Sequence, residues 1–316
     1  MEDKPLYFPP FDRELAYRFL YLTRCPMCDN PFPKGNKILG HRLNTSQGFR
    51  PARKVGITTA IFQCKGCGLI GCTPLPIPSS VGAHYDIDPQ TYWQDPAFFD
   101  IPAGFFAREI DIAKALLGGD VVGKRALDIG SGIGKNIYVL SQAGFDVYGI
   151  EPSKTFRDKA VELQYAQPDR LILASLEEAE FPEAFFDFIT FSAVLEHLYS
   201  PDYALRKALR WLRPGGILHV EVPSAKWLVA KVLNLYYRLR GTDYVTHCSP
   251  MHPPFHLWEF SVESFKKHGE KVGYIVEKVE YLPGEVRPLR PLIRLLRPMM
   301  KLTHADMQLV VWLRRR

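Results

Sequence analysis

Between residues 105 and 222 the apolar positions follow two spacings in turn. Short apolar runs, typical of buried strands, alternate with segments whose apolar residues recur every three or four positions, as on one face of a helix. The runs predict strands at residues 125–129, 146–150, 171–174, 186–191 and 217–222, and the periodic segments predict helices at 105–117, 135–143, 154–164 and 204–212. This alternation predicts a parallel sheet with helices on both faces.

The flanking segments are less regular. Helical spacing recurs at residues 226–240, 262–272 and 288–302, and residues 305–312 fit a last strand, which we expect to be antiparallel at the sheet edge. Towards the N-terminus, residues 12–22 fit a short helix and residues 57–63 a strand, whereas six prolines between residues 73 and 104 argue against regular structure there.

These patterns suggest three parts of the chain. We predict an N-terminal unit (residues 1–75), a connector rich in aromatic residues and proline (76–104) and a main domain (105–316) with an insertion at about 224–258.

The strand at residues 125–129 ends in three glycines, at positions 130, 132 and 134, and a helix follows at once. Glycine lets a ligand approach the backbone, and the helix start offers unpaired N–H groups and the positive end of its dipole. A strand, glycine turn and helix in this order are typical of a nucleotide-binding site.

Two acids indicate which nucleotide binds there. Asp128 precedes the first glycine by two residues; it would repel a pyrophosphate but can accept hydrogen bonds from an ammonium group. Glu151, at the end of the next strand, suits two ribose hydroxyls. A ligand with an amino-acid end and a ribose end matches both acids, which favours S-adenosylmethionine. The alternatives are a Rossmann unit that binds NAD and an ordinary βαβ turn.

Two further loops follow strand ends, where sheets of this kind bind ligands. Residues 175–177 are placed to contact adenine, and residues 191–193 to lie near the methionyl group. The predicted cofactor-binding residues are Asp128, Gly130, Ser131, Gly132, Glu151, Pro152, Ser175, Leu176, Phe191 and Ser192. In the connector, Tyr85 or Tyr92 fits either a contact with the methionine carboxylate or simple aromatic packing.

The N-terminal unit carries two cysteine pairs, Cys25/Cys28 and Cys64/Cys67, separated by 35 residues. Two such pairs, each in a tight turn, can place four thiolates at the corners of a tetrahedron, and Zn²⁺ is the ion that prefers this arrangement. Four cysteines leave no open position for catalysis, so we predict a structural zinc site. A redox pair and four unrelated thiols are the alternatives.

The net charge and the N-terminal residues bear on the binding partners and the cellular location of the protein. Forty Lys and Arg against 34 Asp and Glu leave a net charge of +6, which is weak evidence for nucleic-acid binding. The first residues are charged, and no uncharged apolar run is long enough to span a bilayer, so we expect neither a secretory leader nor a spanning helix. We therefore expect a cytoplasmic, reducing location without disulfides.

Residues 126–223 together resemble the class I S-adenosylmethionine-dependent methyltransferases; the matching segments are LDIGSGIG, GIEPS, FDFITFSAVLEHL and LRPGGILHVEVP. The resemblance implies an α/β fold: a Rossmann-like, doubly wound, mostly parallel sheet of seven strands with an antiparallel last strand. It also implies that Asp128, Gly130 and Gly132 line the methionine side of the cofactor, with Glu151 on the ribose and Leu176 near adenine.

The order of segments along the chain also resembles that of a narrower group of proteins. The cysteine pairs, a tyrosine-rich stretch and this domain resemble, in that order, the zinc-ribbon methyltransferases of bacterial sugar, polysaccharide and natural-product pathways. Those proteins often carry Pro-Glu-His-Leu before an aromatic residue and a serine, where this chain has Pro254-Phe255-His256-Leu257. Phe255 replaces the acid, which leaves His256 as the matching residue.

Methyl transfer to a hydroxyl needs a base, because the hydroxyl proton must leave. His197, just past the fourth strand, and His256 are the predicted catalytic residues, since histidine titrates near neutral pH. Packing at a helix start is the alternative for His197, and a structural hydrogen bond is favoured for Glu196. No Asn/Asp-Pro-Pro-aromatic motif follows the fourth strand, so O-methylation is favoured over methylation of an exocyclic amine, and C-methylation stays open.

The insertion and the C-terminal segment suggest how the methyl acceptor is covered and which chemical groups it carries. The amphipathic segment at 226–240 is predicted to form a lid over the acceptor pocket. Residues 287–316 hold eight basic residues and one acid, which fits a phosphate-bearing or lipid-linked acceptor or an anionic membrane surface. A solvated face on a covering helix is the alternative.

Three functions follow from these patterns. The first is an O-methyltransferase for a small molecule, sugar or glycan. The second is an RNA methyltransferase whose zinc ribbon grips nucleic acid, suggested by eight basic residues between positions 24 and 67. The third is a cofactor-binding partner subunit without catalysis, against which the presence of Asp128 and Glu151 argues.

Overall fold

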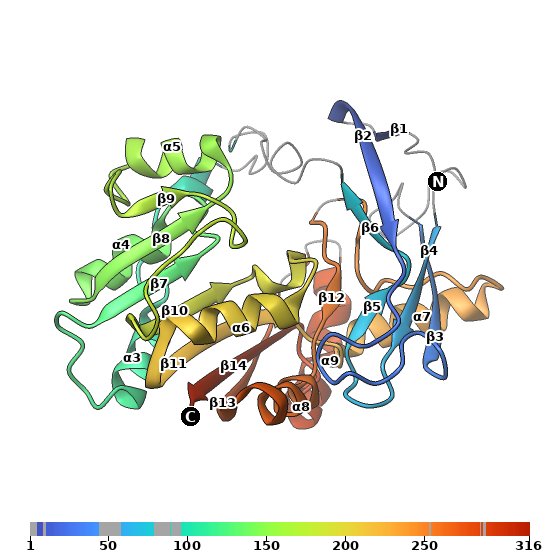
Figure 1. Ribbon diagram of the computed structural model, residues 1–316. Helices are drawn as coiled ribbons and strands as arrows, with labels where there is room; N and C mark the ends of the chain where they lie inside the picture. Colours follow the sequence, from blue (N-terminus) through green and yellow to red (C-terminus); the bar gives the residue numbers. More distant parts are fainter. Residues whose placement is uncertain are drawn as a thin grey trace.

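A computed structural model of the chain describes residues 5–8, 11–43, 58–78, 89, 96–252, 254–284, 286 and 289–316. Its largest element is a seven-stranded sheet with the strand order β13-β14-β11-β10-β7-β8-β9 (Figure 1). The strands are β7 (Arg125–Ile129), β8 (Asp146–Glu151), β9 (Leu171–Leu173), β10 (Phe186–Ser192), β11 (Leu212–Pro223), β13 (Tyr274–Leu282) and β14 (Gln308–Arg315).

Neighbouring strands from β9 to β11 are parallel, and β14 is antiparallel to both β11 and β13. The predicted Rossmann-like sheet with an antiparallel last strand is confirmed. The position expected for that strand is wrong, because β14 lies inside the sheet and β13 forms the edge. The apolar pattern expected of a strand is interrupted in β13 by the charged residues Glu277, Lys278 and Glu280. An edge strand tolerates such charges because one side of it faces solvent.

Helices cover both faces of this sheet. Residues of α3 (Ala107–Leu116), α4 (Lys135–Gln142) and α5 (Lys154–Glu162) share one buried cluster, and those of α6 (Pro201–Trp211) and α8 (Val262–Val272) share another. Successive residues of a strand point to opposite faces: Phe188 belongs to the first cluster and Ile189 to the second. The predicted two-sided layering is therefore present.

Serines begin three of these helices. The side chains of Ser153, Ser200 and Ser261 accept hydrogen bonds from backbone N–H groups in the first turns of α5, α6 and α8. Pro201 occupies the first turn of α6, where a missing N–H costs nothing, as expected from the sequence.

The N-terminal segment forms a three-stranded antiparallel sheet from β1 (Pro5–Phe8), β2 (Phe11–Leu20) and β6 (Leu75–Pro78). The helix predicted for residues 12–22 is wrong, because β2 pairs with strands on both sides. The segment predicted to be irregular also contains β6 and the short 3₁₀ helix η1 (Pro96–Phe99). Prolines are tolerated in β6 because it is an edge strand.

A third sheet joins the N-terminal unit to the main domain. Its order is β12-β5-β4-β3, with β3 (Lys37–Leu43), β4 (Thr58–Gln63), β5 (Ile70–Cys72) and β12 (Trp258–Glu259). β12 comes from the main domain, and it is followed by Ser261, whose hydroxyl donates to the carbonyl oxygen of Cys67. The two parts therefore share a sheet as well as a core, although the domain boundaries themselves stay a prediction.

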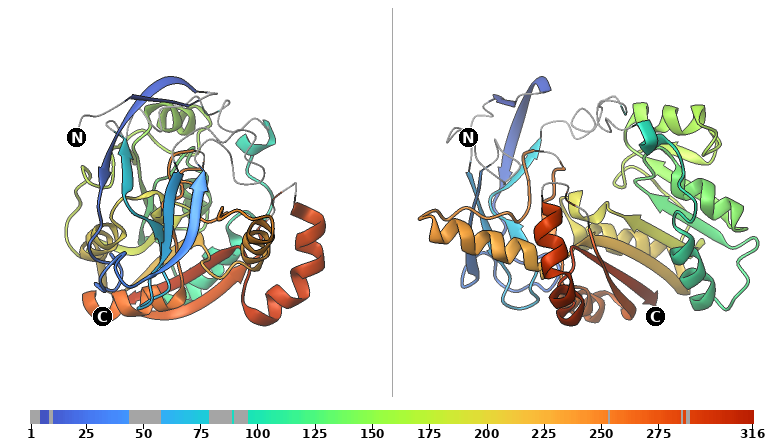
Figure 2. Two further views of the ribbon diagram at one scale, coloured as in Figure 1. Left: turned by 90° about the vertical axis from the view of Figure 1, so that its right-hand side faces the viewer. Right: turned by 180° about the vertical axis from the view of Figure 1, so that it is seen from behind.

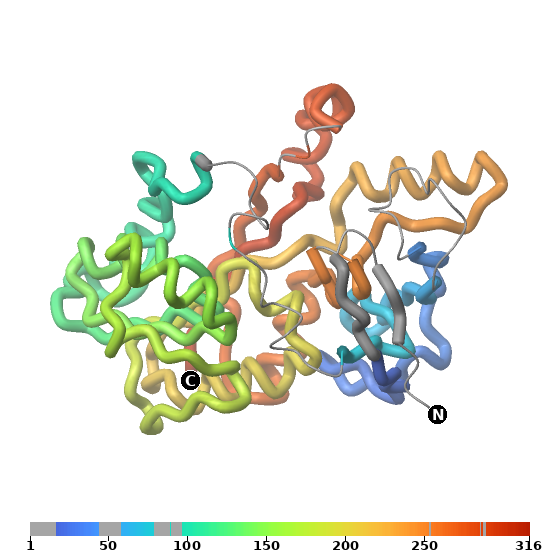
Figure 3. The backbone as a smooth tube through the Cα atoms, turned by 90° about the horizontal axis from the view of Figure 1, so that it is seen from above, coloured from blue at the N-terminus to red at the C-terminus, as the bar shows by residue number. Residues whose placement is uncertain are grey.

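Two helices lie outside these layers. α7 (Leu228–Leu239) and α9 (Arg290–Thr303) pack against each other through a small cluster that includes Val229, Ile293 and Met300. Both lie towards the viewer in the right-hand view of Figure 2, and Figure 3 shows α7 beside the N-terminal strands, away from α4 and α5. In the part of the chain that the structure describes, no helix is long and apolar enough to cross a bilayer.

Candidate functional site

The turn after β7 has the backbone that its glycines predict. Gly130, Gly132 and Gly134 have φ values of 69°, 54° and 81°, a region that other residues rarely adopt. A Cβ atom on Gly130 would lie 2.7 Å from a methyl carbon of Val194, whereas one on Gly132 would meet nothing within 4 Å. The backbone at Gly132 therefore faces open space.

That space is a cavity of about 600 Å³ beyond the carboxyl ends of β7, β8, β9 and β10. Seven of the predicted site residues line it: Gly130, Gly132, Glu151, Pro152, Ser175, Leu176 and His197. Arg18 of β2 and Ile77 of β6 also line it, and the sequence contains no signal for their presence because they lie more than 45 residues before the glycine turn. Its volume is in the range of small-molecule sites.

Glu151 is held at the rim of this cavity by backbone N–H groups. Its Oε2 accepts a hydrogen bond from the N–H of Gly132 at 2.8 Å, and its Oε1 accepts one from Ser153 at 2.9 Å. Burial raises the pKa of the Glu151 carboxyl to about 7 despite these bonds. The carboxyl group thus has a fixed direction, and its remaining lone pairs can accept bonds from hydroxyl groups of a ligand.

Asp128 lies in β7 and is 1% exposed, so it does not line the cavity directly. Its Oδ1 accepts a hydrogen bond from Nδ2 of Asn136 at 3.3 Å, and its Oδ2 has no hydrogen-bond partner among the described residues. Burial raises the pKa of this carboxyl to about 7. An unpartnered buried carboxylate oxygen is costly, and a cationic group beside it would relieve that cost.

Three other predicted cofactor residues also lie off the cavity wall. Ser131 donates its hydroxyl to the carbonyl oxygen of Asp128, which supports the turn. Phe191 is fully buried in the core, and Ser192 donates to Oε2 of Glu221 at 3.5 Å. Tyr85 and Tyr92 lie outside the residues that the structure describes. Direct contacts of all these side chains with a cofactor stay predictions.

The residues present fit S-adenosylmethionine. Asp128 offers an unsatisfied acceptor for an ammonium group, Gly132 leaves room for a ligand against the backbone, and Glu151 offers acceptors for ribose hydroxyls. Leu176 and Phe156 add an apolar wall for a base. The cavity thus combines polar groups at the glycine turn and Glu151 with apolar side chains at Phe156 and Leu176, as a ligand with an amino-acid end and a nucleoside end requires.

The two predicted catalytic histidines lie together: His197 lines the cavity, and His256, which is not among the lining residues, packs against the ring of His197. His197 belongs to the 3₁₀ turn η2 (Leu195–His197) after β10, and His256 to the loop before β12. Their ring centroids are 4.9 Å apart with the planes at 71°. The N–H of Leu257 donates to the carbonyl oxygen of Glu196 at 2.8 Å, which ties the two segments together.

Glu196 completes this group, although the sequence favours only a structural role for it. Its Oε1 lies 3.9 Å from Nε2 of His197 and 3.8 Å from Nε2 of His256. Its Oε2 has no hydrogen-bond partner in the described part of the chain. The side chains of both Glu196 and His197 thus lie close to His256. The segment Val-Leu-Glu-His therefore contributes two residues to this group.

Burial sets the charge of this group. It raises the pKa of the Glu196 carboxyl to about 8, lowers that of His197 to about 4 and lowers that of His256 well below its usual value. Both imidazoles are consequently neutral at pH 7, and a neutral imidazole can accept a proton. Such an imidazole has a free lone pair but binds a proton weakly, because burial penalises the imidazolium.

The four predicted zinc ligands also come together. The sulfur atoms of Cys25, Cys28, Cys64 and Cys67 all lie within 4.8 Å of one another. Cys25 Sγ is 3.6 Å from Cys67 Sγ, and Cys28 Sγ is 3.5 Å from Cys64 Sγ. Hydrogen bonds among the thiols lower the pKa of Cys64 and, together with burial, raise the pKa of Cys25 and Cys67 above the usual value. A divalent cation would reverse that effect, because it favours thiolates.

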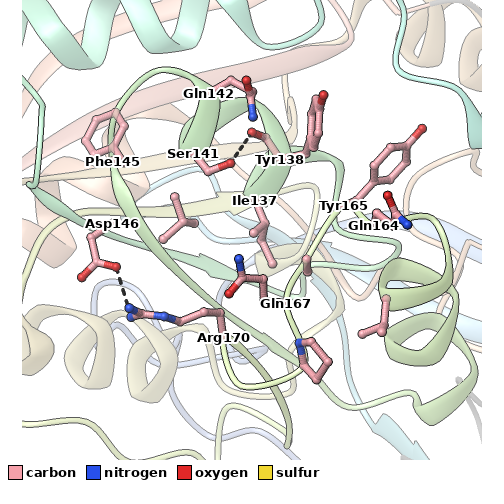
Figure 4. Close-up of a pocket in the computed structure, with 14 residues that line it drawn as sticks. Ile137, Tyr138, Ser141, Gln142, Phe145, Asp146, Gln164, Tyr165, Gln167 and Arg170 are labelled. Atoms are coloured by element: carbon pink, nitrogen blue, oxygen red, sulfur yellow. Dashed lines mark hydrogen bonds and ion pairs between the residues drawn. The ribbon is translucent and has the colours of Figure 1, made fainter.

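A second cavity, of about 570 Å³, lies at the opposite, amino end of β8 (Figure 4). α4 and the segment after α5 line it, and the Arg170–Asp146 ion pair, at 3.1 Å, closes one side. None of the predicted site residues reaches it. Ligands of such sheets bind at the carboxyl ends of the strands, so this cavity is not the candidate site.

Comparisons with known proteins agree with this geometry. Residues 106–279, more than half of the chain, match the model of a methyltransferase domain. A ubiquinone biosynthesis O-methyltransferase of Bradyrhizobium diazoefficiens is 28% identical over 131 residues, which cover 40% of this chain and 51% of that protein. The ubiquinone/menaquinone biosynthesis C-methyltransferase UbiE of Vibrio vulnificus is 32% identical over 105 residues, 31% of this chain and 40% of that protein.

The chain thus spans about half the length, or less, of these curated relatives. Among solved structures, an S-adenosylmethionine dependent methyltransferase from Mesorhizobium loti is 18% identical with a TM-score of 0.47, over 69% of this chain and all of that one. The family match over residues 106–279 includes the glycine turn, Glu151 and the Glu196–His197 segment. The chain therefore belongs to the class I S-adenosylmethionine-dependent methyltransferases.

Proposed function

We propose that this protein methylates a hydroxyl group of a small-molecule, sugar or lipid-linked glycan acceptor, with S-adenosylmethionine as donor. One observation carries the proposal: the neutral histidines His197 and His256 meet beside the cofactor cavity, next to Glu196. Two of the relatives, one named as an O-methyltransferase and one as a C-methyltransferase, are small-molecule enzymes by name, which supports an acceptor of that size.

In this proposal His256 accepts the hydroxyl proton. Its side chain is 27% exposed, against 16% for His197, although only His197 lines the cofactor cavity. When bound, S-adenosylmethionine supplies a methyl group on a sulfonium, whose thioether leaves readily. His256 would accept the proton of the acceptor hydroxyl on an imidazole nitrogen, and the donor would supply the methyl group as its carbon–sulfur bond breaks.

The remaining residues position and enclose the reactants. His197 packs edge-on against His256 and holds its ring, and the backbone bond between Leu257 and Glu196 holds both segments. Val194 and Gly130 close the cavity beneath them, which helps to exclude water from the reacting atoms. α7, formed as expected, is proposed to cover the acceptor, although it belongs to a separate cluster with α9.

We further propose that the four cysteines hold Zn²⁺ in a closed structural site. Four sulfur donors in two tight turns are the ligand set of such sites, and the geometry leaves no position for a substrate. Metal analysis of the purified protein should find about one zinc per chain, and a chain without zinc but with full stability would contradict the assignment.

The RNA alternative gains no support from the fold. Arg42, one of the basic residues expected to contact nucleic acid, is 4% exposed and donates to His252 and to the carbonyl oxygen of Val245. Arg50, Arg53 and Lys54 lie outside the described residues. We therefore keep RNA as one arm of the activity test.

A labelled-methyl transfer screen over sugar nucleotides, lipid-linked glycans, phenolic small molecules and RNA tests the activity. Label in a hydroxyl-bearing small molecule or glycan supports the proposal, and label only in RNA overturns it. Calorimetry with S-adenosylhomocysteine tests the cofactor site independently. Asp128→Ala should weaken binding at least about tenfold. Equal affinity would show that Asp128 does not face the cofactor.

A further inference from the structure

The C-terminal helix α9 presents three different faces. Its inward face, with Ile293 and Met300, is buried against α7. A second face carries four exposed basic residues at spacings of four, three and four: Arg290, Arg294, Arg297 and Lys301. The helix contains no acidic residue. Since positions three and four apart share a helix face, these side chains form one cationic stripe.

The third face is apolar and lies in water. Leu295, Met299 and Leu302, again spaced by four and three residues, are 76%, 49% and 83% exposed. A single exposed leucine is ordinary, but a row of large apolar side chains along one helix face marks a surface that binds something. At 3.6 residues per turn this face lies about 120° around the helix from the cationic stripe, and Pro291 and Pro298 lie between the two.

α7 extends the same kind of surface. Its C-terminal half exposes Leu235, Tyr236 and Leu239, which are 55%, 54% and 78% exposed, beside the exposed Arg238 and Arg240. α7 and α9 pack on each other and lie on the same side of the molecule in the right-hand view of Figure 2. The two exposed patches therefore belong to one structural unit.

We propose that α7 and α9 dock the protein on an anionic lipid bilayer. The leucines and Met299 enter the boundary between headgroups and acyl chains, and the cationic stripe contacts lipid phosphates. Charge selects this occupant over a second copy of the chain, because a symmetric contact would bring two cationic stripes together. The proposal does not depend on which acceptor is methylated.

Co-sedimentation of the full chain with vesicles tests it. The protein should bind vesicles that contain phosphatidylglycerol, bind phosphatidylcholine vesicles more weakly by about tenfold or more, and lose affinity as salt is added. The double variant Leu295→Ser/Leu302→Ser should lose about tenfold or more in affinity. Arg294→Gln/Lys301→Gln should lose the preference for the anionic lipid.

Val122→Ser is the matched control, since Val122 is 76% exposed but lies in the loop before β7. It should bind vesicles like the unmodified chain, and all variants should keep their affinity for S-adenosylhomocysteine, which reports an intact fold. Equal binding by the leucine variant and the unmodified chain overturns the proposal. So does a dimer that forms without lipid and dissociates in the leucine variant, because it assigns the surface to a second copy.

Discussion

Two candidate metal- or proton-binding groups in this protein differ in how much of their geometry is local to the chain. In the cysteine cluster and in the Glu196–His197–His256 group alike, the donor atoms lie within 4.8 Å of one another. The cysteines come from two tight turns whose own backbone bonds place them, Asp29 N–H to Cys25 and Gly68 N–H to Cys64. His256 instead lies 60 residues from Glu196 and reaches it only through the packing of the whole chain.

The comparison teaches that the N-terminal unit positions part of the candidate active site. The loop with His256 leads directly into β12, whose Trp258 and Glu259 pair with Gly71 and Ile70 of β5. β5 follows the second cysteine turn within a few residues. The cysteine cluster therefore lies beside the strand that supports the histidine loop, so in the proposed function the proposed zinc site has an indirect role in catalysis.

The largest effect is expected from Cys64→Ser. Removing one thiolate from a closed zinc site should abolish zinc binding and lower the free energy of unfolding by several kcal/mol, about 3 or more. Because β5 carries β12, methyl transfer should be lost with it. Zinc content and thermal unfolding measure the change. The matched control is Cys248→Ser, since Cys248 is a buried cysteine outside the cluster and should leave zinc content unchanged.

His256→Ala tests the other group directly. Loss of a general base lowers kcat by roughly 10² to 10⁴, with the affinity for S-adenosylhomocysteine unchanged. The measurement is methyl transfer beside calorimetry, once an acceptor is known. His197→Ala, the neighbouring ring, should have a smaller effect on kcat. A larger loss in His197→Ala would exchange the roles of the two histidines.

The buried carboxyls predict how stability depends on pH. Burial raises the pKa of Asp128 and Glu151 to about 7 and that of Glu196 to about 8, all above their values in the unfolded chain. Each of these carboxyls binds more proton in the folded than in the unfolded chain between about pH 4 and pH 8, so its own contribution to the free energy of unfolding falls as pH rises through this range. The buried histidines His197, His219 and His256, whose pKa values are lowered, contribute in the opposite sense below about pH 6.5.

Thermal unfolding at several pH values measures this trend. Glu196→Gln should match the unmodified chain near pH 5 and be the more stable of the two near pH 9, because glutamine keeps the site neutral. A variant with an unchanged pH profile would mean that Glu196 is ionised in the folded protein, and the histidines would then face a charged partner.

The smallest effect is expected from Ser261→Ala, which weakens the link between the two groups. It removes both the cap of α8 and the hydrogen bond to the carbonyl oxygen of Cys67. The expected cost is about 1–2 kcal/mol of stability, with zinc retained and a modest loss of methyl transfer. Ser200→Ala, which removes the cap of α6, is the control. An equal loss of transfer in both variants would argue against coupling between the units.

The site elements that the sequence predicted well are local. The glycine turn, the acid at the end of β8 and each cysteine pair depend on residues close together in the chain, so their backbone geometry follows from spacing alone. The role of Glu196 was harder to predict, because the sequence alone does not distinguish a carboxyl in a functional group from one that makes a structural hydrogen bond. The positions of Arg18 and Ile77 in the cavity wall could not be predicted, since no motif near them in the chain indicates a binding site.

The order of apolar and polar residues by itself determined the alternating strands and helices, the parallel sheet and the nucleotide-binding turn. Only the tertiary structure decided that residues 11–20 form a strand, that β13 rather than β14 lies at the edge, and that β12 completes the cysteine-bearing sheet. The physical reason is pairing: a helix makes its backbone hydrogen bonds within itself, whereas a strand makes them with partners that can lie anywhere in the chain.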